Sequence, residues 1–344
     1  SMAGVGPRFG GPGSDVAIGA PDEGNGVVRF YRLPPAVGQT LGPVLSQTGS
    51  TSGERFGASV AGLSDWHGVT AGSPAMVVSS GETTSASIYN GTYFPAVNLT
   101  ATINTGFRST AASAGDVNGV GYGDFVMASR SSTTSMTPAQ VTLFKGGAGS
   151  LRTIGLVMPT GNQPPQYVTG GSGDLNGDGF SDVVITDTAN EMLVIQWGGV
   201  EPIDRQLGFN HPGGQVVANA GDVTGDGRSD IIVGDPTPDG GTVVIHSNVL
   251  GNASALLLDA PPNIVRFGEW VSTAGDVNGD ARADVLVVGR SRQAPSARVA
   301  MVYVANPDGG SPLDWWSDAL ASATSTIAQV GDLNADGYED LAIA

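Results

Sequence analysis

One ten-residue pattern, which occurs five times, constrains the fold of this chain more than any other feature. In its fullest form it reads Gly-Asp-Leu-Asn-Gly-Asp-Gly-Phe-Ser-Asp and covers residues 173–182. The other copies begin at Gly115, Gly221, Gly275 and Gly331, and the closing aspartates of neighbouring copies are 48 to 58 residues apart. Recurrence at such a period indicates a repeat architecture rather than several unrelated domains.

Two short apolar segments follow most copies of the pattern. The first is an almost continuous run of apolar residues, which predicts a buried strand. These runs are residues 125–128, 183–185, 231–233, 285–288 and 341–344. The second segment alternates more between apolar and polar residues and predicts another strand. The second segments are residues 141–144, 193–197, 243–246 and 299–304.

Two degenerate copies extend the series toward the N-terminus, so that the chain holds seven. They lie near residues 8–19 and 62–78, and the second keeps its first aspartate, Asp65. The clear copies lie near residues 115–128, 173–186, 221–234, 275–288 and 331–344.

Repeats of about 50 residues that contain only strands predict an all-β fold, namely a seven-bladed β-propeller of four-stranded antiparallel blades. We expect it to form a single domain over residues 1–344. A β-solenoid would need shorter repeats, and a row of sandwiches would need units about twice as long.

The polar residues of the pattern have the spacing of a loop that binds a hard cation. If the first Asp is position 1, side-chain oxygens stand at positions 1, 3, 5 and 9, and position 7 can offer its backbone carbonyl. Ca²⁺ takes six to eight oxygen ligands, so this set suits it. Gly at position 6 permits the positive φ that folds the loop around an ion. The alternative for any single copy is an Asx turn between strands, with no ion.

Four copies carry a nearly complete set of oxygen ligands. The predicted ligands are Asp174, Asn176, Asp178, Phe180, Asp182, Asp222, Thr224, Asp226, Arg228, Asp230, Asp276, Asn278, Asp280, Arg282, Asp284, Asp332, Asn334, Asp336, Tyr338 and Asp340. Ala281 replaces the position-6 Gly in one of these copies, which should strain the turn by about 1 kcal/mol.

A fifth copy is weaker as a metal site. It retains the candidate ligands Asp116, Asn118, Tyr122 and Asp124, but Val120 stands where the others have the position-5 carboxylate. We therefore expect about four bound Ca²⁺ ions and a fifth site of lower affinity.

The composition limits which partners the chain can bind and in which compartment it can act. The chain has 15 Lys and Arg against 32 Asp and Glu, a net charge of −17, which argues against nucleic acid because phosphate binding needs basic patches. It has no cysteine, so disulfides and thiolate chemistry are excluded. No apolar run is long enough to predict membrane insertion. Weak calcium loops fill where Ca²⁺ is near millimolar, so we expect an extracellular or cell-surface location.

Two further short elements recur outside the loops. One is Phe-Gly, at residues 56–57 and 267–268, and the other is Gly-X-Pro, at residues 19–21 and 234–236. With the repeated loop, these elements resemble the FG-GAP repeat family, the propeller repeat of integrin α subunits and of many bacterial surface proteins. The resemblance covers nearly the whole chain. It implies seven blades, with calcium loops that join the first and second strands of a blade.

The resemblance also implies a function: a calcium-stabilised binding or adhesion module whose protein or glycan ligand contacts the face opposite the calcium loops. Residues 144–147 and 197–199 resemble the bacterial versions of the repeat. The ligand-face loops would lie near residues 22–26, 129–138, 186–190, 234–241 and 289–297. Arg130, Arg290 and Arg292 stand out there in an acidic chain, although solvated loop charges are the alternative interpretation.

An enzyme is the competing class of function. No His-Glu-X-X-His, Gly-X-Ser-X-Gly or phosphate-binding loop pattern occurs, and His67, His211 and His246 form no recognisable acid–base set. We therefore expect that the chain is not an enzyme. The alternative is a carbohydrate-binding or carbohydrate-active propeller, a lectin or a lyase or hydrolase. The tryptophans that could stack on a sugar in that case are Trp66, Trp270, Trp315 and Trp316.

Overall fold

The computed structural model shows an all-β chain. It describes residues 1–4, 15–32, 42–65, 74–80, 85–90, 98–104, 107–130, 140–147, 152–156, 167–187, 191–200, 206–210, 216–249, 254–305, 315–319, 327–332 and 336–343. Within these ranges there are 26 strands and no helix. Accordingly, no helix in the described part is long and apolar enough to cross a membrane.

The strands form seven small antiparallel sheets in chain order, numbered here sheet 1 to sheet 7. Sheet 1 contains β1 (Met2–Gly4), β2 (Asp15–Ala20), β3 (Val27–Arg32) and β4 (Leu45–Thr48). Sheet 2 contains β5 (Phe56–Asp65), β6 (Pro74–Ser80), β7 (Ser85–Asn90) and β8 (Asn98–Asn104). Sheet 3 contains β9 (Phe107–Gly115), β10 (Asp124–Arg130), β11 (Gln140–Lys145) and β12 (Arg152–Leu156).

The next three sheets follow the same plan, and sheet 7 has two strands in the described residues. Sheet 4 contains β13 (Tyr167–Gly173), β14 (Asp182–Asp187), β15 (Met192–Gln196) and β16 (Gln206–Asn210). Sheet 5 contains β17 (Val216–Gly221), β18 (Asp230–Asp235), β19 (Thr242–Ser247) and β20 (Ser254–Asp259). Sheet 6 contains β21 (Ile264–Gly275), β22 (Asp284–Ser291), β23 (Arg298–Tyr303) and β24 (Trp315–Ala319). Sheet 7 contains β25 (Ile327–Gly331) and β26 (Asp340–Ile343).

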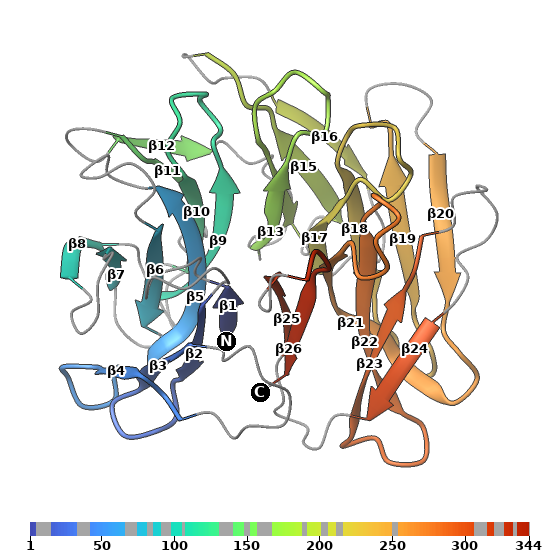
Figure 1. Cartoon of the computed structure of the whole chain (residues 1–344), viewed down its shortest axis with the longest axis horizontal. Coiled ribbons are helices and arrows are strands. Elements are labelled where there is room, and N and C mark those ends of the chain that lie inside the picture. The colour runs from blue at the N-terminus through green and yellow to red at the C-terminus, as the bar shows by residue number, and fades with distance from the viewer. Residues whose placement is uncertain are drawn as a thin grey trace.

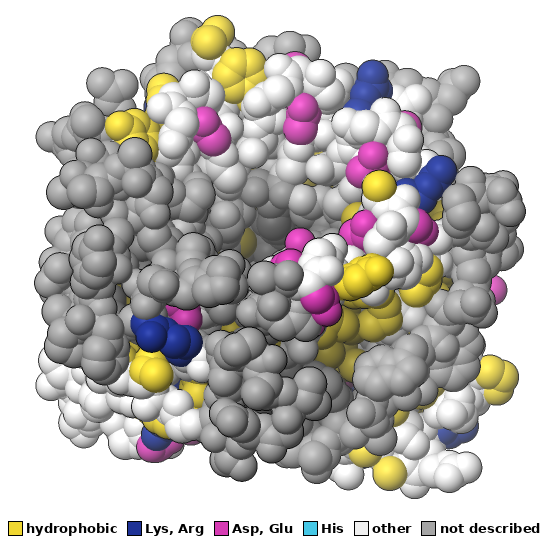
Figure 2. All heavy atoms as spheres, viewed as in Figure 1, with side chains coloured by type: hydrophobic (Ala, Val, Ile, Leu, Met, Phe, Trp, Pro, Cys, Tyr) yellow, Lys and Arg dark blue, Asp and Glu magenta, His cyan; other side chains and the backbone are white. Residues whose placement is uncertain are grey.

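The first strands of the sheets form an inner row. β5 contacts β9, and the contacts continue through β13, β17 and β21 to β25. β25 also contacts β1, and β1 contacts β5, so the row returns to its start. Figure 1 shows the sheets following one another around the middle of the molecule, with β1 beside β25 and β26. Figure 2 shows more acidic than basic side chains on the visible face, as the negative net charge requires.

The strands predicted from apolar runs are present. The second strand of a sheet is buried along its length, as in β14 and β18, because sheets pack against both of its faces. The third strand alternates in β19, where every second residue is buried. The first and fourth strands were not located from the sequence, because their segments share no common pattern. β13 is mostly Gly, Ser and Thr, whereas β17 and β20 are largely apolar.

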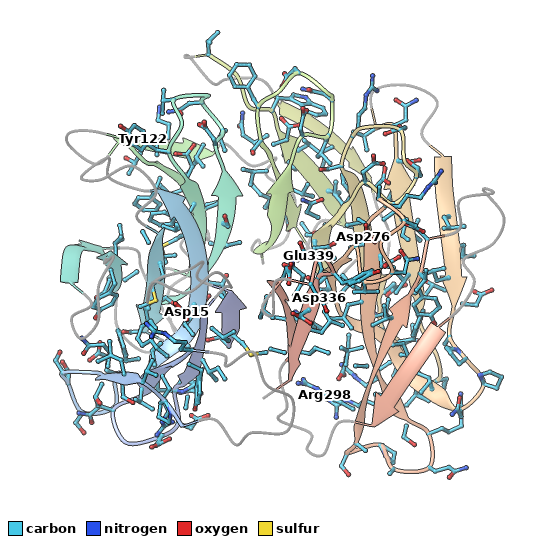
Figure 3. The ribbon with its side chains drawn as sticks, viewed as in Figure 1. Asp15, Tyr122, Asp276, Arg298, Asp336 and Glu339 are labelled. Carbon is cyan, nitrogen blue, oxygen red and sulfur yellow. The ribbon has the colours of Figure 1, made fainter. Side chains whose placement is uncertain are left out.

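The two degenerate copies are described in part. Residues 5–14 and 66–73, which hold most of the first two predicted loops, lie outside the described residues. β2 and β6 nevertheless follow them as expected. Asp15 (Figure 3) is buried at the start of β2, where Asp124 stands at the start of β10. The end of the pattern is therefore kept in sheet 1.

The Phe-Gly and Gly-X-Pro elements meet across neighbouring sheets. A Cβ on Gly234 would lie 2.2 Å from the carbonyl oxygen of Gly268, and one on Gly19 would lie 2.1 Å from that of Gly57. The preceding phenylalanines are buried, with Phe267 0% and Phe56 3% exposed. Since only glycine allows such close backbones, each pair ties one sheet to the next.

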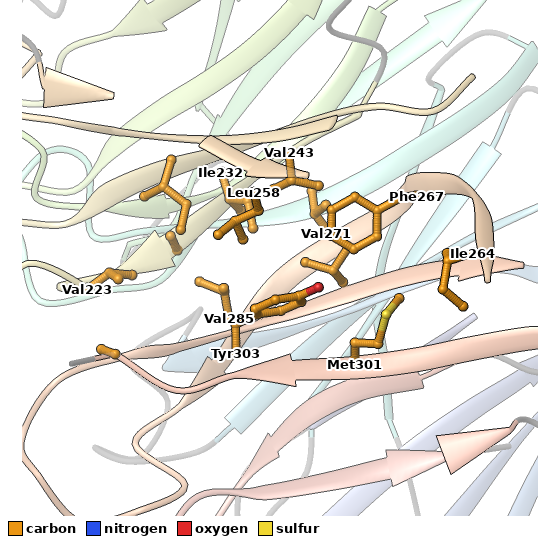
Figure 4. Close-up of a cluster of buried hydrophobic side chains, with 14 residues drawn as sticks. Val223, Ile232, Val243, Leu258, Ile264, Phe267, Val271, Val285, Met301 and Tyr303 are labelled. Atoms are coloured by element: carbon orange, nitrogen blue, oxygen red, sulfur yellow. The ribbon is translucent and has the colours of Figure 1, made fainter. Parts of the chain in front are cut away.

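The largest core cluster lies between sheets 5 and 6 (Figure 4). Val243 of sheet 5 and Phe267, Val285 and Tyr303 of sheet 6 all belong to it. The rings of Phe267 and Tyr303 meet edge to face, with centroids 6.0 Å apart. Full burial of each large side chain stabilises the fold by roughly 1.5–3 kcal/mol. Because the cluster contains residues of both sheets, this burial holds sheet 5 against sheet 6.

Candidate metal centre

Each of the five clear patterns forms the loop between the first and second strands of its sheet. Numbered by sheet, they are loop 3 (116–124), loop 4 (174–182), loop 5 (222–230), loop 6 (276–284) and loop 7 (332–340). The last residue of each loop is also the first residue of the following strand. All five loops therefore lie at the same end of their sheets.

The position-1 carboxylate organises the backbone of its own loop. In loop 4, Oδ1 of Asp174 accepts the N–H of Gly177 at 2.6 Å and of Asp178 at 3.0 Å, and Oδ2 accepts that of Gly179 at 2.8 Å. Equivalent bonds from positions 5 and 6 form in every other loop, to Asp116, Asp222, Asp276 and Asp332. These bonds form an Asx-type turn, which a metal-free loop could also adopt.

The predicted positive φ at position 6 is confirmed. It is 87° at Gly179 and 84° at Gly227, and Ala281 has 65° despite its Cβ. Ala281 thus has the strained backbone conformation that the sequence predicts. Position 4 also has positive φ, as at Gly177 (76°) and Gly225 (73°). The sequence analysis missed this second requirement, although Gly occupies position 4 in four of the five loops.

The position-9 carboxylate is buried and joins the loop to the sheet beneath. Asp182 is 0% exposed, and its oxygens accept the N–H groups of Leu175 and Gly198, both at 2.8 Å. Asp124 and Asp284 form the same two kinds of bond. Each of these three aspartates links position 2 of its loop to the residues after the third strand.

Asp230 differs from the other three. Its Oδ2 accepts the N–H groups of Val223 at 2.9 Å and Thr224 at 3.0 Å. Its Oδ1 is buried and has no hydrogen-bond partner. A buried carboxylate oxygen without a donor is costly, and a bound cation would remove that cost. Loop 5 therefore offers an oxygen atom with the chemistry of a metal ligand.

Burial makes these carboxylates hard to ionise. It is the main cause that raises the pKa of Asp124 and Asp182 to about 6 and that of Asp230 to about 7. The pKa of Asp284 is raised for the same reason. Backbone N–H donors lower each pKa, whereas the neighbouring carboxylates of the loop raise it. A divalent cation would reverse the effect of those neighbours.

Positions 3 and 5 are linked to each other on the exposed side of the loop. The amide of Asn176 donates to Oδ2 of Asp178 at 2.9 Å, and Asn278 and Asp280 form the same pair at 3.0 Å. In loop 3, the N–H of Val120 still donates to Asp116 and Asn118. The turn thus forms without a carboxylate at position 5, and Val120 removes a ligand but leaves the loop conformation in place.

The candidate ligands fit a calcium loop only if carboxylates, an amide or hydroxyl oxygen and a backbone carbonyl bind the ion together. Among the described residues, no three His, Cys, Asp or Glu side chains gather closely enough to hold a metal by themselves. The set predicted from the sequence also uses the Asn or Thr oxygen at position 3 and the carbonyl at position 7, which suits the oxygen preference of Ca²⁺. Asn334 lies outside the described residues, so loop 7 is seen in part.

Neighbouring loops are docked on one another, a relationship that the sequence analysis did not predict. The position-8 N–H of each of loops 4 to 7 donates to the position-1 carbonyl of the loop before it. A Cβ on any position-4 glycine of loops 3 to 6 would meet the position-7 side chain of the next loop. These pairs are Gly119 with Phe180, Gly177 with Arg228, Gly225 with Arg282, and Gly279 with Tyr338.

The position-7 residues therefore have a second role beyond offering a carbonyl. The side chains at position 7 of loops 4 to 7 cover the preceding loop, which explains why the residue is large in these four copies. Figure 3 shows Asp276 of loop 6 close to Asp336 and Glu339 of loop 7. The N–H of Glu339 donates to the carbonyl of Asp276 at 3.1 Å. The loops consequently form one continuous row.

Other residues singled out from the sequence lie elsewhere. Trp270 is half-buried and packs against the cores of sheets 6 and 7. His246 is half-buried on β19. Trp66, His67 and His211 lie outside the described residues. Arg290 and Arg292 lie at the end of sheet 6 opposite its loop.

Comparison with known proteins agrees with the sequence pattern. Residues 174–233 match the family model of the FG-GAP-like repeat. No curated protein matches the sequence. The crystal structure of a functionally unknown protein from Desulfotomaculum acetoxidans is similar, with 12% sequence identity and a TM-score of 0.46 over 86% of this chain and 77% of that one. The stretch that contains loops 4 and 5 is therefore an FG-GAP-like repeat.

Proposed function

We propose that this chain is a calcium-stabilised, seven-bladed β-propeller that serves as an extracellular binding or adhesion module of the integrin-α type. Seven consecutive sheets support the propeller, because their first strands contact one another in an order that returns to β1. The FG-GAP-like repeat at residues 174–233 supports the proposal that the propeller is of the integrin-α type. In this proposal the chain binds a partner and catalyses no reaction.

The observation that carries the calcium proposal is the recurrence of one oxygen-rich loop at the same end of five sheets. The ligands would be the side chains at positions 1, 3, 5 and 9 and the carbonyl at position 7. When bound, Ca²⁺ supplies positive charge that offsets the crowded carboxylates. Loops 4, 5, 6 and 7 would hold one ion each, and loop 3, with Val120, would bind more weakly.

Calcium would then act mainly on stability and location. Extracellular sites of this kind have Kd values of roughly 10⁻⁴ to 10⁻³ M. At millimolar Ca²⁺, each site contributes up to about 1.4 kcal/mol by mass action. Since domains are stable by only about 5–15 kcal/mol, four such sites are a large share, and they would fill outside the cell.

In this proposal a protein or glycan partner binds the end of the sheets that lies opposite the loops. The net charge of −17 disfavours nucleic acid there. A carbohydrate-active alternative would use exposed aromatic rings, but Trp270 packs into the core, so nothing in its surroundings favours that alternative.

Thermal unfolding tests the calcium proposal. The melting temperature is measured with 2 mM Ca²⁺ and with excess chelator, and the bound metal is counted on the purified protein. We expect a large drop in melting temperature with chelator and about four Ca²⁺ per chain. An unchanged melting temperature with no bound metal would show that the loops are bare Asx turns, and the extracellular assignment would lose its support.

A further inference from the structure

A basic pocket opens at the end of sheets 5 and 6 that lies opposite the loops. Its volume is about 360 Å³. It is lined by Pro238, Val265, Arg266, Arg290, Arg292 and Pro295. These residues come from the β18–β19 connection, the start of β21, and the end of β22 with the connection that follows. The pocket thus belongs to the end that the proposed function assigns to a partner.

One buried carboxylate is surrounded by three guanidinium groups behind this pocket. The side chain of Glu269 is 6% exposed, and its Oε2 accepts from Nε of Arg290 at 2.7 Å and of Arg266 at 3.2 Å. Its Oε1 accepts from Nε of Arg298 at 3.0 Å. Burial alone would raise the pKa of Glu269, but the bonds from Arg290 and Arg266 outweigh it and lower the pKa. Glu269 therefore stays ionised among the three guanidinium groups.

Arg292 adds a fourth cation whose charge is not neutralised by an ion pair. Its Nε donates to the carbonyl of Pro262 at 3.2 Å, and its Nη2 donates to that of Asp239 at 2.7 Å. Both acceptors are uncharged, and in the described ranges Arg292 has no carboxylate within ion-pair distance. Four of the 15 basic residues of the chain thus gather at one place, three of them around the buried Glu269.

The backbone holds this cluster in a fixed arrangement. The N–H of Arg266 donates to the carbonyl of Thr237 at 2.9 Å, and that of Phe267 donates to Gly240 at 2.8 Å. Arg266 has φ 51° and precedes the buried Phe-Gly element. The side chains of Arg266 and Arg290 are held by Glu269, and that of Arg292 is held by two backbone carbonyls. Ordering these guanidinium groups for a ligand would therefore cost little entropy.

Sheets 1 and 2 provide an internal comparison. Arg55 precedes Phe56 just as Arg266 precedes Phe267, and it has φ 53°. However, Ala58 stands there in the place of Glu269, and Arg55 pairs with Asp22 at 2.8 Å. Both sites thus have the arginine before Phe-Gly, but of these two sites the one at sheets 5 and 6 has the cluster around a buried glutamate.

We propose that this pocket binds the carboxylate of an acidic side chain on a peptide segment of a protein partner. Arg266 and Arg292 would contact the carboxylate, since a guanidinium matches it with two parallel donors. Pro238, Val265 and Pro295 form the apolar part of the wall and would contact the neighbouring peptide residues. A sugar is disfavoured because the lining contains no aromatic ring on which it could stack. This inference deepens the binding role proposed above and rests on it.

Phage display tests the inference: peptides that bind the protein are selected at 150 mM salt from a random octapeptide library. The targets are the wild-type chain, the double variant Arg266→Ala/Arg292→Ala, and the matched control Arg55→Ala. Ala tolerates φ 51° no better than Arg does, so the double variant should leave the backbone strain unchanged and melt near the wild-type temperature. Trigalacturonate is titrated separately as the acidic saccharide probe.

We expect Asp or Glu to be enriched at one peptide position with the wild type and with Arg55→Ala, and not with the double variant. A synthetic peptide with Glu at that position should bind at least tenfold more tightly than its Gln counterpart. Absence of acidic enrichment, enrichment that persists in the double variant, or binding of trigalacturonate alone would each overturn the inference. The calcium loops lie at the other end of the sheets, so a failed calcium test would leave the peptide result to be scored independently.

Discussion

The backbone N–H of Ser229 in loop 5 donates a hydrogen bond of 2.8 Å to the carbonyl oxygen of Asp174 in loop 4. The same bond joins loop 4 to loop 3, loop 6 to loop 5 and loop 7 to loop 6. Each loop thus rests on the one before it through backbone atoms that any residue provides. A change in one loop should therefore reach its neighbours, and the loops should respond to calcium as a row rather than as isolated sites.

The positive φ of Ala281 predicts a stabilising substitution. Ala281→Gly removes the Cβ that makes φ 65° unfavourable, so we expect the free energy of unfolding to rise by about 1 kcal/mol. The measurement is urea unfolding of the metal-free protein. Ala283→Gly, two residues later and not at positive φ, is the matched control and should lower the free energy of unfolding by roughly 0.5–1 kcal/mol. Equal effects of the two substitutions would contradict the assigned strain.

Two glycines separate the cost of backbone conformation from the cost of space. Gly227 has φ 84°, but a Cβ there would meet no atom within 4 Å, so Gly227→Ala should cost about 1–2 kcal/mol. Gly234 has an ordinary φ, but its Cβ would lie 2.2 Å from the carbonyl oxygen of Gly268. Because two backbones must move apart, Gly234→Ala should cost more than Gly227→Ala. Urea unfolding of the two variants compares them, and the reverse order would refute the close packing of the Phe-Gly and Gly-X-Pro elements.

The parts of this fold that depend on residues close together in the chain could be predicted from the sequence. The buried second strands, the positions of the third strands and the loops before the second strands follow from patterns within about ten residues. The alternation predicted for the third strands holds in β19, whereas β15 and β23 are buried over most of their length, because other sheets pack on them. The positive φ at Gly179 and Gly227 follows in the same way from the turn chemistry of the loop.

The relationships between sheets could not be predicted in that way. The contact of Arg282 with Gly225 joins residues of different repeats, and no local pattern records which repeat lies beside which. Arg290 and Arg292 were noticed because basic residues are rare here. The ion pair of Arg290 with Glu269, and the place of Arg266 beside both arginines in the pocket, depend on a bulge in β21. Glu269 after one Phe-Gly, where Ala58 follows another, was the available signal.

The buried aspartates predict an unusual pH dependence for the metal-free protein. Burial raises the pKa of Asp182 to about 6 and that of Asp230 to about 7, whereas an unfolded Asp titrates near 3.9. Between these values the folded chain binds more protons than the unfolded chain, so its stability falls as the pH rises. We expect the metal-free protein to melt at a higher temperature at pH 5.5 than at pH 7.5.

Calcium should reverse that order, because it binds the ionised carboxylates and is displaced by protons. The control is therefore the same pair of melting curves in 2 mM Ca²⁺, where pH 7.5 should give the higher melting temperature. A metal-free protein that is less stable at pH 5.5 than at pH 7.5 would show that the buried aspartates are ionised without difficulty in the folded state.

Arg282 predicts how loop docking tunes calcium affinity. Its Nη1 donates to the carbonyl of Thr224 at 2.6 Å, so a fixed positive charge lies over the candidate ligands of loop 5. Arg282→Met keeps the length of the side chain and removes that charge, which lowers the repulsion of a bound cation by roughly 1 kcal/mol in a partly solvated site. Calorimetric titration should show one site that binds Ca²⁺ several-fold more tightly. Tyr338→Met at the same position of loop 7 removes no charge from above loop 6, so equal changes in both variants would refute an electrostatic role for Arg282.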